Sequence, residues 1–422
     1  MIVAVLAIGS RGDVQPYVAL ADGLRRAGHA VHFVTSTEFV DLAKEYDLTV
    51  EVVPFSVQAA LAERSAQRAV EGGSHARSFA AFARIARTAN RAFASAALAA
   101  AEGADVVVGG LSALAIGTGV AERSGIPFLP ALNVPIDPTS AWPGALFPNL
   151  RLGPPSLSNR TSHHLTRLAL WLTIRTGADA ARVEVIGAAP LPRFGGLRHL
   201  LPAELPALYG ISSAILPEPD DWPASRRVVG TLFLDPPDGW QPDPELEAFL
   251  AAGSPPVYIG FGSMGVDDPA STARLVLDAV RAAGLRAIVH RGWARLLADD
   301  PPASVHFVDS VPHTWLLPRV AAAVHHGGAG TTAAGLRAGV PAVIVPFHGD
   351  QFFWARRVLE LGAGPAPITR RRLDADRLAA ALVAATSDPT LRRRAAALGN
   401  QIRAEDGVGD AVRWIEDTAS GS

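Results

Sequence analysis

Short, mostly apolar segments recur along this chain of 422 residues, and helical segments separate them. Ile2–Ile8 is the first, and the others lie at 30–35, 50–53, 104–109, 127–131, 257–261, 286–290, 305–307, 321–325 and 342–346. Continuous apolar runs of this length are typical of strands that are buried on both faces of a parallel sheet. Their alternation with helices predicts an α/β protein built from doubly wound sheets.

A proline-rich stretch divides this series of strands and helices into two. Prolines stand at nine positions between 217 and 256, and 422 residues at roughly 100–200 per domain favour two domains. We therefore predict a first Rossmann-like domain over 1–222, a linker over 223–245, a second Rossmann-like domain over 246–400 and a final helix over 401–422.

Composition excludes several classes of protein. Hydrophobic residues make up 49% of the chain and charged residues 18%, which excludes a mainly disordered protein. The formal net charge of −2 argues against nucleic-acid binding, because a general binder needs a basic excess to neutralise phosphates. The absence of cysteine excludes disulfides, thiolate metal sites and a cysteine nucleophile.

Nothing in the sequence predicts integral membrane association. No apolar stretch approaches the ~20 residues of a membrane span, and the apolar N-terminus lacks the positive segment that begins a signal peptide. The apolar segment Leu165 to Ile174 is predicted to be a packed helix, because arginines stand close to both of its ends. We therefore expect a soluble, cytoplasmic protein.

The strongest local motif is HHGGAGTT at 325–332, which lies between a predicted strand and a predicted helix. A glycine-rich turn at a helix N-terminus exposes backbone N–H groups and the positive end of the helix dipole, and both favour phosphate. We expect Gly328 and Gly330 to allow a phosphate to approach closely. We expect hydrogen-bond donors from His326, Thr331 and Thr332. The motif has no lysine, so it is not a Walker loop. The alternative is a helix start that binds no ligand.

A second glycine-rich segment, GFGSMG at 260–265, matches the dinucleotide-binding pattern GxGxxG. That pattern also requires an acidic residue at the end of the next strand, where this chain has His290, Arg291 and Gly292. A nicotinamide cofactor is therefore disfavoured, and we expect Ser263 and its N–H to face a phosphate instead. An NAD(P)-dependent oxidoreductase is kept as an alternative function.

Polar residues follow the neighbouring predicted strands. Asp350 and Gln351 come one strand after the phosphate motif, where their side chains could bind adjacent sugar hydroxyls, although Asp350 could simply cap a helix. The backbone of Val311 could contact a base at the same edge of the sheet. Trp293 could stack on that base or belong to the core.

The first half of the chain holds a candidate general base. GSRGDVQP at 9–16 follows the first strand, and the helix after it is predicted at Pro16–Ala27. Asp13 could accept a proton from an acceptor hydroxyl, or could cap that helix. Arg11 could pair with Asp13 or contact the donor, and Ser10 and Gly12 are further candidate donor contacts.

Two less regular regions are candidates for binding an apolar acceptor. They are the long insert at 55–101 and the Pro-, Trp- and Phe-rich segment at 134–155, and their aromatic candidates are Phe55, Phe79, Trp142 and Phe147. Four arginines share one face of the helix predicted in the insert, as a solvated face or as a wall of a binding site: Arg77, Arg84, Arg87 and Arg91.

No metal site is predicted. The sequence Asp374-Ala-Asp376 is explained by capping of the helix that follows, and the histidines do not form a ligand cluster. We therefore expect neither a metal nor another cofactor.

Five motifs in this order resemble those of one known family: GSRGDVQP at 9–16, GFGSM at 260–264, RGW at 291–293, HHGGAGTT at 325–332 and GDQ at 349–351. The chain resembles, over essentially its whole length, the inverting nucleotide-sugar-dependent glycosyltransferases of family 1, which have the GT-B fold. It is most similar to the bacterial branch that glycosylates natural products, such as the vancomycin-type enzymes, and to sterol glucosyltransferases.

The resemblance implies two Rossmann-like doubly wound domains that face each other across a cleft, with the C-terminal helix packed back on the N-terminal domain. It implies that Asp13 is the catalytic base, that Ser263, His326 and Thr331 bind the donor diphosphate, and that Val311 binds its base through the backbone. It assigns the sugar hydroxyls to Asp350 and Gln351. Plant members have tryptophan where this chain has Ser310 and asparagine where it has Trp354.

The implied activity is metal-independent transfer of a hexose to a hydrophobic aglycone or sterol-like acceptor. UDP-glucose is the first expectation for the donor, and a dTDP-sugar is the alternative. Two different functions would use the same fold, namely that of a UDP-sugar epimerase-type enzyme and that of an inactive accessory partner. A monomer or a weak dimer is expected.

Overall fold

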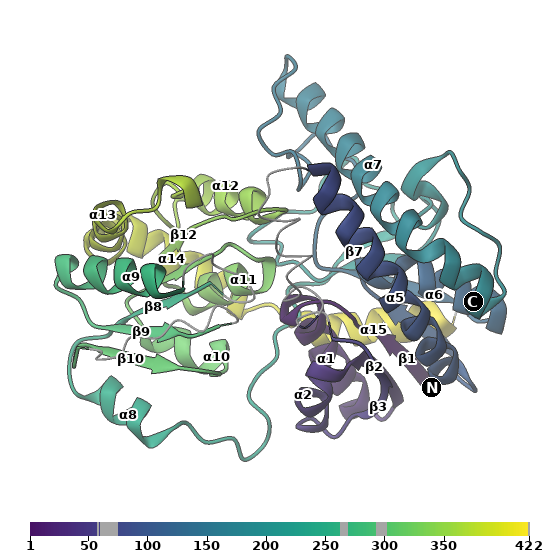
Figure 1. The fold of residues 1–422 in the computed structure, drawn as a ribbon, viewed down its shortest axis with the longest axis horizontal. Helices are drawn as coiled ribbons and strands as arrows, with labels where there is room; N and C mark the ends of the chain where they lie inside the picture. Colours follow the sequence, from purple (N-terminus) through teal and green to yellow (C-terminus); the bar gives the residue numbers. More distant parts are fainter. Residues whose placement is uncertain (57–58, 60–74, 262–268, 293–301, 421–422) are drawn as a thin grey trace. The chain divides into compact units, whose positions relative to one another are not determined.

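The structure is a computed structural model that describes residues 1–56, 59, 75–261, 269–292 and 302–420, with side chains except at 75–86. Its internal contacts divide the chain into two units. Unit 1 comprises 1–211, 218–232 and 407–422, and unit 2 comprises 212–217 and 233–406. Each unit is built around its own parallel sheet (Figure 1), so the predicted α/β fold with two doubly wound domains is confirmed.

The sheet of unit 1 has the strand order β3-β2-β1-β4-β5-β6-β7. The strands are β1 (Ile2–Leu6), β2 (Ala30–Ser36), β3 (Thr49–Val53), β4 (Val106–Gly109), β5 (Phe128–Leu132), β6 (Ala207–Tyr209) and β7 (Arg226–Val228). All residues of β4 and β5 are buried, as expected for strands covered on both faces. The chain leaves β1 toward β2 and β3 and returns on the other side as β4, so the direction of the sheet reverses between β1 and β4.

Six α-helices accompany this sheet in the described part of unit 1: α1 (Arg11–Arg26), α2 (Val40–Lys44), α5 (His75–Ala101), α6 (Leu114–Ser124), α7 (Pro155–Ala181) and α15 (Gly407–Ser420). The C-terminal helix α15 packs on α1, where a Cβ added at Gly23 would lie 2.4 Å from Cγ1 of Val408. His29 and Glu416 make a contact of 2.8 Å between the same two regions. The last sixteen residues therefore belong to the N-terminal unit.

The sheet of unit 2 has the order β10-β9-β8-β11-β12. Its strands are β8 (Val257–Gly260), β9 (Ala287–His290), β10 (Val305–Val308), β11 (Ala322–His325) and β12 (Ala342–Ile344). The described helices are α8 (Pro244–Ala251), α9 (Pro269–Ala283), α10 (His313–Leu316), α11 (Ala329–Ala338), α12 (Gln351–Leu361), α13 (Ala375–Ser387) and α14 (Pro389–Arg403).

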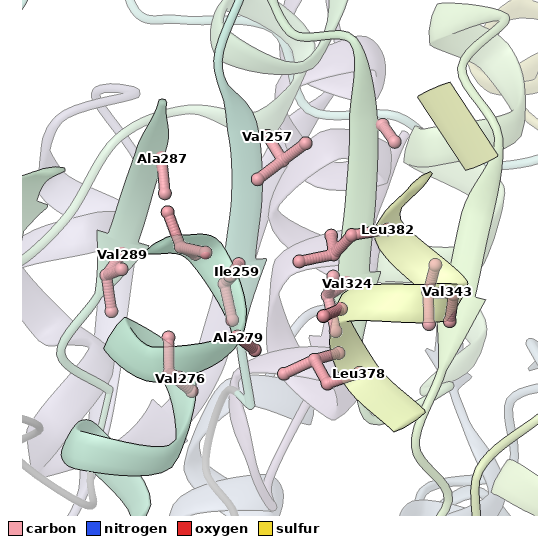
Figure 2. Close-up of a cluster of buried hydrophobic side chains, with 14 of the residues drawn as sticks. Val257, Ile259, Val276, Ala279, Ala287, Val289, Val324, Val343, Leu378 and Leu382 are labelled. Carbon is pink, nitrogen blue, oxygen red and sulfur yellow. The ribbon is translucent and has the colours of Figure 1, made fainter. Parts of the chain in front are cut away.

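One face of this sheet is covered by α9 and α13. Figure 2 shows side chains of β8, β9, β11 and β12 meeting side chains of these two helices, among them Ile259, Val324 and Leu378, all fully buried. Burial of each such side chain contributes about 1.5–3 kcal/mol. A core of this kind explains why the strand segments could be recognised from their composition.

The proline-rich segment expected to be a linker contains regular structure. Strand β7 lies within 223–245 and extends the sheet of unit 1, and α8 begins there at Pro244, where the Asp243 side chain accepts the N–H of Glu245. The strand was not predicted because it is only three residues long and begins with two arginines. Upstream of it, residues 212–217 belong to unit 2, where Ser213 donates to Glu405 through its N–H and its hydroxyl.

Two predicted helices differ from expectation. Helix α1 begins at Arg11 rather than Pro16, because Ser10 and Asp13 cap its N-terminus and Pro16 is accommodated near the start of the helix. The segment 165–174 is helical within α7, but three of its leucines are exposed instead of packed.

Two further observations concern helices. Asp374 caps α13 by accepting the N–H of Arg377, so the capping interpretation of the Asp-x-Asp sequence is confirmed. Among the residues that the structure describes, no helix combines the length and the apolarity needed to cross a membrane.

Candidate active site

The reversal of strand order in unit 1 places the N-terminus of α1 at a defined position. In doubly wound sheets, the connections on the two sides of such a reversal diverge and leave a crevice at the carboxyl ends of the two strands. Residues 7–13 follow β1, and Gly109-Gly110 ends the neighbouring β4. Asp13, in the first turn of α1, therefore lies at this switch point.

The Asp13 carboxylate is held on one side only. The N–H and the hydroxyl of Ser10 both donate to its Oδ2, each at 2.8 Å. Within the described part of the chain, Oδ1 has no hydrogen-bond partner and the carboxylate has no ion pair. Arg11 donates its Nε–H to Gln15 at 2.9 Å, and Asp13 is thus left with one oxygen that can accept a proton.

The surroundings of Asp13 shift its proton affinity in the direction that a base needs. The protein around the carboxyl removes water from it, and this desolvation raises the pKa of Asp13 above its ordinary value of 3.8. The two hydrogen bonds from Ser10 oppose the shift. The residue is nevertheless exposed to solvent and can be approached by a substrate. A raised pKa makes the carboxylate a better proton acceptor.

Gly9 makes this position of Asp13 possible. Its φ is +140°, a conformation that side chains rarely adopt, and a Cβ there would lie 2.6 Å from Oδ2 of Asp13. Gly9→Ala is therefore expected to displace the carboxylate and to lower kcat about 10²-fold, as misplacement by about 1 Å can do.

Gly28→Ala is the matched control for this variant. Gly28 follows α1 and has a φ of +91°, but nothing lies within 4 Å of the added Cβ. Gly28→Ala should strain the backbone without displacing Asp13, so it should reduce the melting temperature and leave kcat unchanged. Equal loss of kcat in the two variants would show that strain, rather than the position of Asp13, limits the rate.

Tyr17 is a residue that the sequence did not single out. Its hydroxyl donates to the carbonyl of Ala131 at 2.6 Å and accepts from the Asn133 side chain at 3.2 Å. Burial, together with the nearby Asp13 charge, raises the pKa of Tyr17, which keeps the phenol protonated. A Cβ at Gly110 would lie 2.0 Å from the hydroxyl, so the glycine that follows β4 was the available sequence signal.

The segment after β5 is held on α7 by hydrogen bonds to its backbone. Gly144 N–H donates to the Ser162 hydroxyl at 2.7 Å, and Nε2 of His163 donates to the carbonyl of Trp142 at 3.1 Å. Burial lowers the pKa of His163 to about 4, so the ring is neutral at neutral pH. These contacts give the candidate acceptor segment a defined conformation.

The four aromatic candidates for acceptor binding have different positions. Trp142 packs edge-on against Trp222 at 5.9 Å, and its buried indole N–H has no hydrogen-bond partner among the described residues. Phe147 is exposed in the same segment. Phe55 follows the edge strand β3, and the side chain of Phe79, on α5, lies outside the described residues. Only Trp142 and Phe147 are thus placed in one segment.

The two described arginines of the insert are exposed, as expected for a solvated face. Arg87 donates to the carbonyl of Thr176 on α7 at 3.2 Å, and Arg91 pairs with Glu184 at 2.7 Å. Both arginines therefore connect α5 to neighbouring elements. The side chains of Arg77 and Arg84 lie outside the described residues.

In unit 2 the strand order reverses between β8 and β11, and the HHGGAGTT motif follows β11. His325, the last residue of β11, is paired in register with Gly260, the last residue of β8. Helix α11 starts four residues later, with Gly328 at its N-cap. The free N–H groups of this helix therefore lie at the switch point, where open α/β sheets bind their ligands.

Side chains of the motif shape this turn. His325 is fully buried, and its Nδ1 accepts the N–H of Gly327 at 3.1 Å. Gly327 has a φ of +88°, and a Cβ there would lie 2.7 Å from Ile344. Burial lowers the pKa of His326 to about 4, so this imidazole is neutral at neutral pH. Phosphate binding here would therefore depend on N–H groups and the helix dipole rather than on an imidazolium.

Three buried polar atoms of the motif lack a hydrogen-bond partner among the described residues. They are Nε2 of His325, Nδ1 of His326 and the hydroxyl of Thr332. Buried polar atoms without partners are rare in folded proteins, and a bound ligand is one explanation. Gly330 is exposed and Thr331 half-buried at the start of the same helix.

The residues predicted to bind the sugar have partners within the protein. The side-chain oxygen of Gln351 accepts the N–H groups of Phe347 and His348, at 2.8 and 3.2 Å. The Asp350 carboxylate accepts the indole N–H of Trp354 at 2.8 Å and does not cap α12. This pair therefore shapes the loop that follows β12, and sugar binding by the pair stays a prediction.

The other predicted donor contacts are distributed as follows. Val311 is half-buried after β10, at the same edge of the sheet as the motif. Ser10, Arg11 and Gly12 begin α1 in unit 1, and Ser263 and Trp293 lie outside the described residues. Within the described residues, no three His, Asp or Glu side chains are grouped so that they could hold a metal ion.

Comparison with known proteins gives two matching domain families. Residues 3–140 match the glycosyltransferase family 28 N-terminal domain. Residues 274–415 match the C-terminal domain of the erythromycin biosynthesis protein CIII-like family. The two matches fall in unit 1 and largely in unit 2, respectively.

Curated relatives match nearly the whole chain. A sterol 3-beta-glucosyltransferase of Candida albicans is 37% identical over 98% of this chain, and one of Arabidopsis thaliana is 35% identical over 97%. The chain spans 27% of the length of the fungal relative and 67% of the plant relative.

Solved structures share the fold at lower identity. The glycosyltransferase VinC, solved in complex with dTDP, superposes with a TM-score of 0.68 at 23% identity over all of both chains. The glycosyltransferase of kitacinnamycin gives 0.67 at 21% identity, over 99% of this chain and 98% of that one. Both have the GT-B architecture of two Rossmann-like domains. The chain therefore belongs to the glycosyltransferase family that contains the sterol 3-beta-glucosyltransferases.

Proposed function

We propose that this protein is an inverting glycosyltransferase that transfers a hexose from a nucleotide sugar to a hydroxyl of a hydrophobic small molecule. The observation that carries the proposal is the Asp13 carboxylate, held by Ser10 through one oxygen and open at the other, in a family of sugar transferases. The curated relatives favour glucose and a sterol-like acceptor, and natural-product aglycones are the other acceptor class. UDP-glucose is the first donor to test, and dTDP-glucose is the second.

The proposed reaction is a single displacement. Asp13 accepts the proton of the acceptor hydroxyl while the acceptor oxygen bonds to the anomeric carbon. The bond between that carbon and the diphosphate oxygen breaks on the opposite side, which inverts the configuration, and the nucleoside diphosphate leaves with the bonding electron pair. Asp13 ends protonated and returns its proton to solvent.

Stabilisation of the leaving diphosphate is assigned to unit 2. The N-terminus of α11 offers N–H groups and the positive end of its dipole, and Thr331, Thr332 and neutral His326 add hydrogen-bonding groups. Negative charge develops on the diphosphate as the bond breaks, so donors placed there lower the barrier more than they strengthen ground-state binding. In this scheme no metal ion is needed, and none is proposed.

The test is a product assay with and without a chelator. The protein is incubated with UDP-glucose or dTDP-glucose and a panel of sterols and polyketide aglycones, and products are identified by mass spectrometry. We expect one hexose to be added to an acceptor at a rate that EDTA does not change. A strict requirement for Mg²⁺ would refute the metal-free scheme.

The same assay separates glycosyl transfer from the two different functions of this fold. Release of UDP without an acceptor, with a free sugar whose configuration has changed at a carbon other than the anomeric carbon, would indicate the epimerase-type reaction. Absence of both sugar products, with nucleotide still bound, would indicate an accessory partner. We also propose that the protein acts in the cytoplasm, because its substrates are a nucleotide sugar and a small molecule. Its proposed oligomeric state is a monomer or a weak dimer.

A further inference from the structure

The first half of helix α7 is oriented with its polar side inward. Its buried residues include Ser158, Asn159, Ser162, His163 and Thr166. Its leucines at 157, 165, 168 and 172 have exposed fractions of 52%, 37%, 51% and 47%. These four positions share one face of an α-helix. A helix of a globular protein normally packs its apolar face inward, so the first half of α7 is inverted relative to that pattern. The second half buries Trp171, Gly177, Ala178 and Ala181 in the usual way.

The inward polar face has a structural explanation within unit 1. Ser158, Ser162 and Thr166 accept backbone N–H groups of the segment before α7, from Leu152, Gly144 and Leu146. The Asn159 side chain donates to the carbonyl of Ser140 at 2.9 Å. Helix α7 also packs against α5. None of these contacts requires leucines on the opposite face.

Exposed hydrophobic side chains are concentrated around this helix. Of the eleven large ones among the described residues, eight lie between 147 and 194, and we call them the α7 patch: Phe147, Leu152, Leu157, Leu165, Leu168, Leu172, Val183 and Phe194. In unit 2, by contrast, Leu359 and Val383 are the two exposed examples among the described residues. Contiguous exposed apolar side chains mark interaction surfaces, and Leu165, Leu168 and Leu172 are neighbours on one face of α7.

The charge of the same region is strongly positive. Residues 141–200 contain seven arginines and two acidic residues, a balance of +5 in a chain whose net charge is −2. Both acidic residues are paired, Asp179 with Arg175 and Glu184 with Arg91.

Some of this positive charge has no acidic partner. Arg160, Arg167 and Arg182 pair with acidic residues from outside the region. Arg151, Arg193 and Arg198 are exposed and form no ion pair among the described residues. The α7 patch therefore combines apolar side chains with uncompensated positive charge.

We propose that the α7 patch docks on the surface of a membrane that contains anionic lipids. Leucines on one face with arginines beside them are the composition of helices that lie in the interface between headgroups and acyl chains. A second copy of the chain is a poorer occupant, because a symmetric contact would bring uncompensated arginines of both copies together. The inference extends the proposed function, since a hydrophobic acceptor partitions into the same membrane.

The test is flotation of the full chain with phosphatidylcholine vesicles, prepared with and without phosphatidylserine, in the absence of donor and acceptor. We expect binding to the anionic vesicles that weakens with added salt and little binding to phosphatidylcholine alone. The double variant Leu168→Ser/Leu172→Ser should lower the partition coefficient at least about tenfold, because two buried leucine contacts are lost. Leu359→Ser/Val383→Ser is the matched control and should bind as the unchanged protein does.

Three results would overturn the proposal. They are no binding to anionic vesicles, equal binding by the α7 double variant, and a dimer in sedimentation velocity that this variant dissociates, since the patch would then be a contact between copies. Thermal unfolding of both double variants checks that they are folded. The flotation assay contains no substrate, so its result is independent of the product assay. A protein that binds the vesicles but forms no product in the product assay would refute the proposed function and leave this inference standing.

Discussion

Replacement of Asp13 by asparagine is expected to lower kcat by about 10²–10⁴-fold and to leave the Kd of the nucleoside diphosphate unchanged. Asparagine has the shape of aspartate, and its side-chain oxygen can still accept the two hydrogen bonds from Ser10. The amide cannot accept the proton of an acceptor hydroxyl, so only the chemical step is affected. The proposed nucleotide site in unit 2 is left intact.

Product formation gives kcat, and titration calorimetry with UDP or dTDP gives the Kd. Asp243→Asn is a suitable control, because Asp243 is an exposed helix cap in unit 2 and asparagine caps helices as well as aspartate does. Full turnover by Asp13→Asn would remove Asp13 as the base. Loss of nucleotide binding in the same variant would show that the substitution acts on folding or on the donor instead.

The pH dependence provides a second readout of the same residue. Transfer requires deprotonated Asp13, so the rate should fall as the pH drops through its folded pKa, which lies above 3.8. The Ser10 hydroxyl lowers that pKa by donating to the carboxylate. Ser10→Ala should therefore move the acidic limb of the rate profile to higher pH. A shift to lower pH would contradict the assignment of the limb to Asp13.

Replacement of Asp137 by alanine is expected to reduce the free energy of unfolding by about 3–5 kcal/mol, because it leaves a buried charge without its partner. Asp137 is 4% exposed and accepts from the fully buried guanidinium of Arg226 on β7. It also pairs with Arg167 of α7 at 3.0 Å and accepts the hydroxyl of Tyr209 at 2.8 Å. Burial and the Asp137 charge raise the pKa of Tyr209, so this phenol stays a donor.

Denaturation of the full chain in urea, followed by tryptophan fluorescence, measures this loss in unit 1. Trp222 reports locally, because its indole N–H donates to the Asp137 carbonyl at 3.2 Å and its ring stacks on Tyr209 at 4.4 Å.

Glu184→Ala is the matched control for the Asp137 variant. Its carboxylate pairs with Arg91 in unit 1, where both side chains are about half exposed, so its removal should cost about 1 kcal/mol or less. A loss of similar size in the two variants would mean that burial of the Arg226 charge is not what makes Asp137 important. Asp137 also holds the segment that carries Trp142, so the acceptor KM should rise in any folded Asp137 variant.

Much of the fold could be predicted because its determinants are local. Strands buried on both faces must be apolar throughout, so β1, β4 and β8 were visible as apolar runs. The phosphate motif was visible for a similar reason, because a turn such as that at Gly327 requires glycine itself. These features depend on neighbours in the sequence and not on distant partners.

Features that depend on distant partners were not predictable. Strand β7 has no apolar run, and its arginine is buried only because Asp137, almost ninety residues earlier, accepts its guanidinium. Asp350 was open to interpretation as a helix cap, whereas its carboxylate meets the indole of Trp354. In each case a side chain has more than one good partner in principle, and the tertiary structure selects one.

The local patterns of the chain were sufficient to predict two α/β units, a glycine-rich turn at the start of a helix and an aspartate after the first strand. They also predicted that the segment 165–174 is helical. Only the tertiary structure decided that the polar face in the first half of α7 packs inward, because helical periodicity relates residues to one another and not to their surroundings. It also decided that Asp13 is held through one oxygen, because that arrangement depends on the conformation of Gly9 and the cap formed by Ser10.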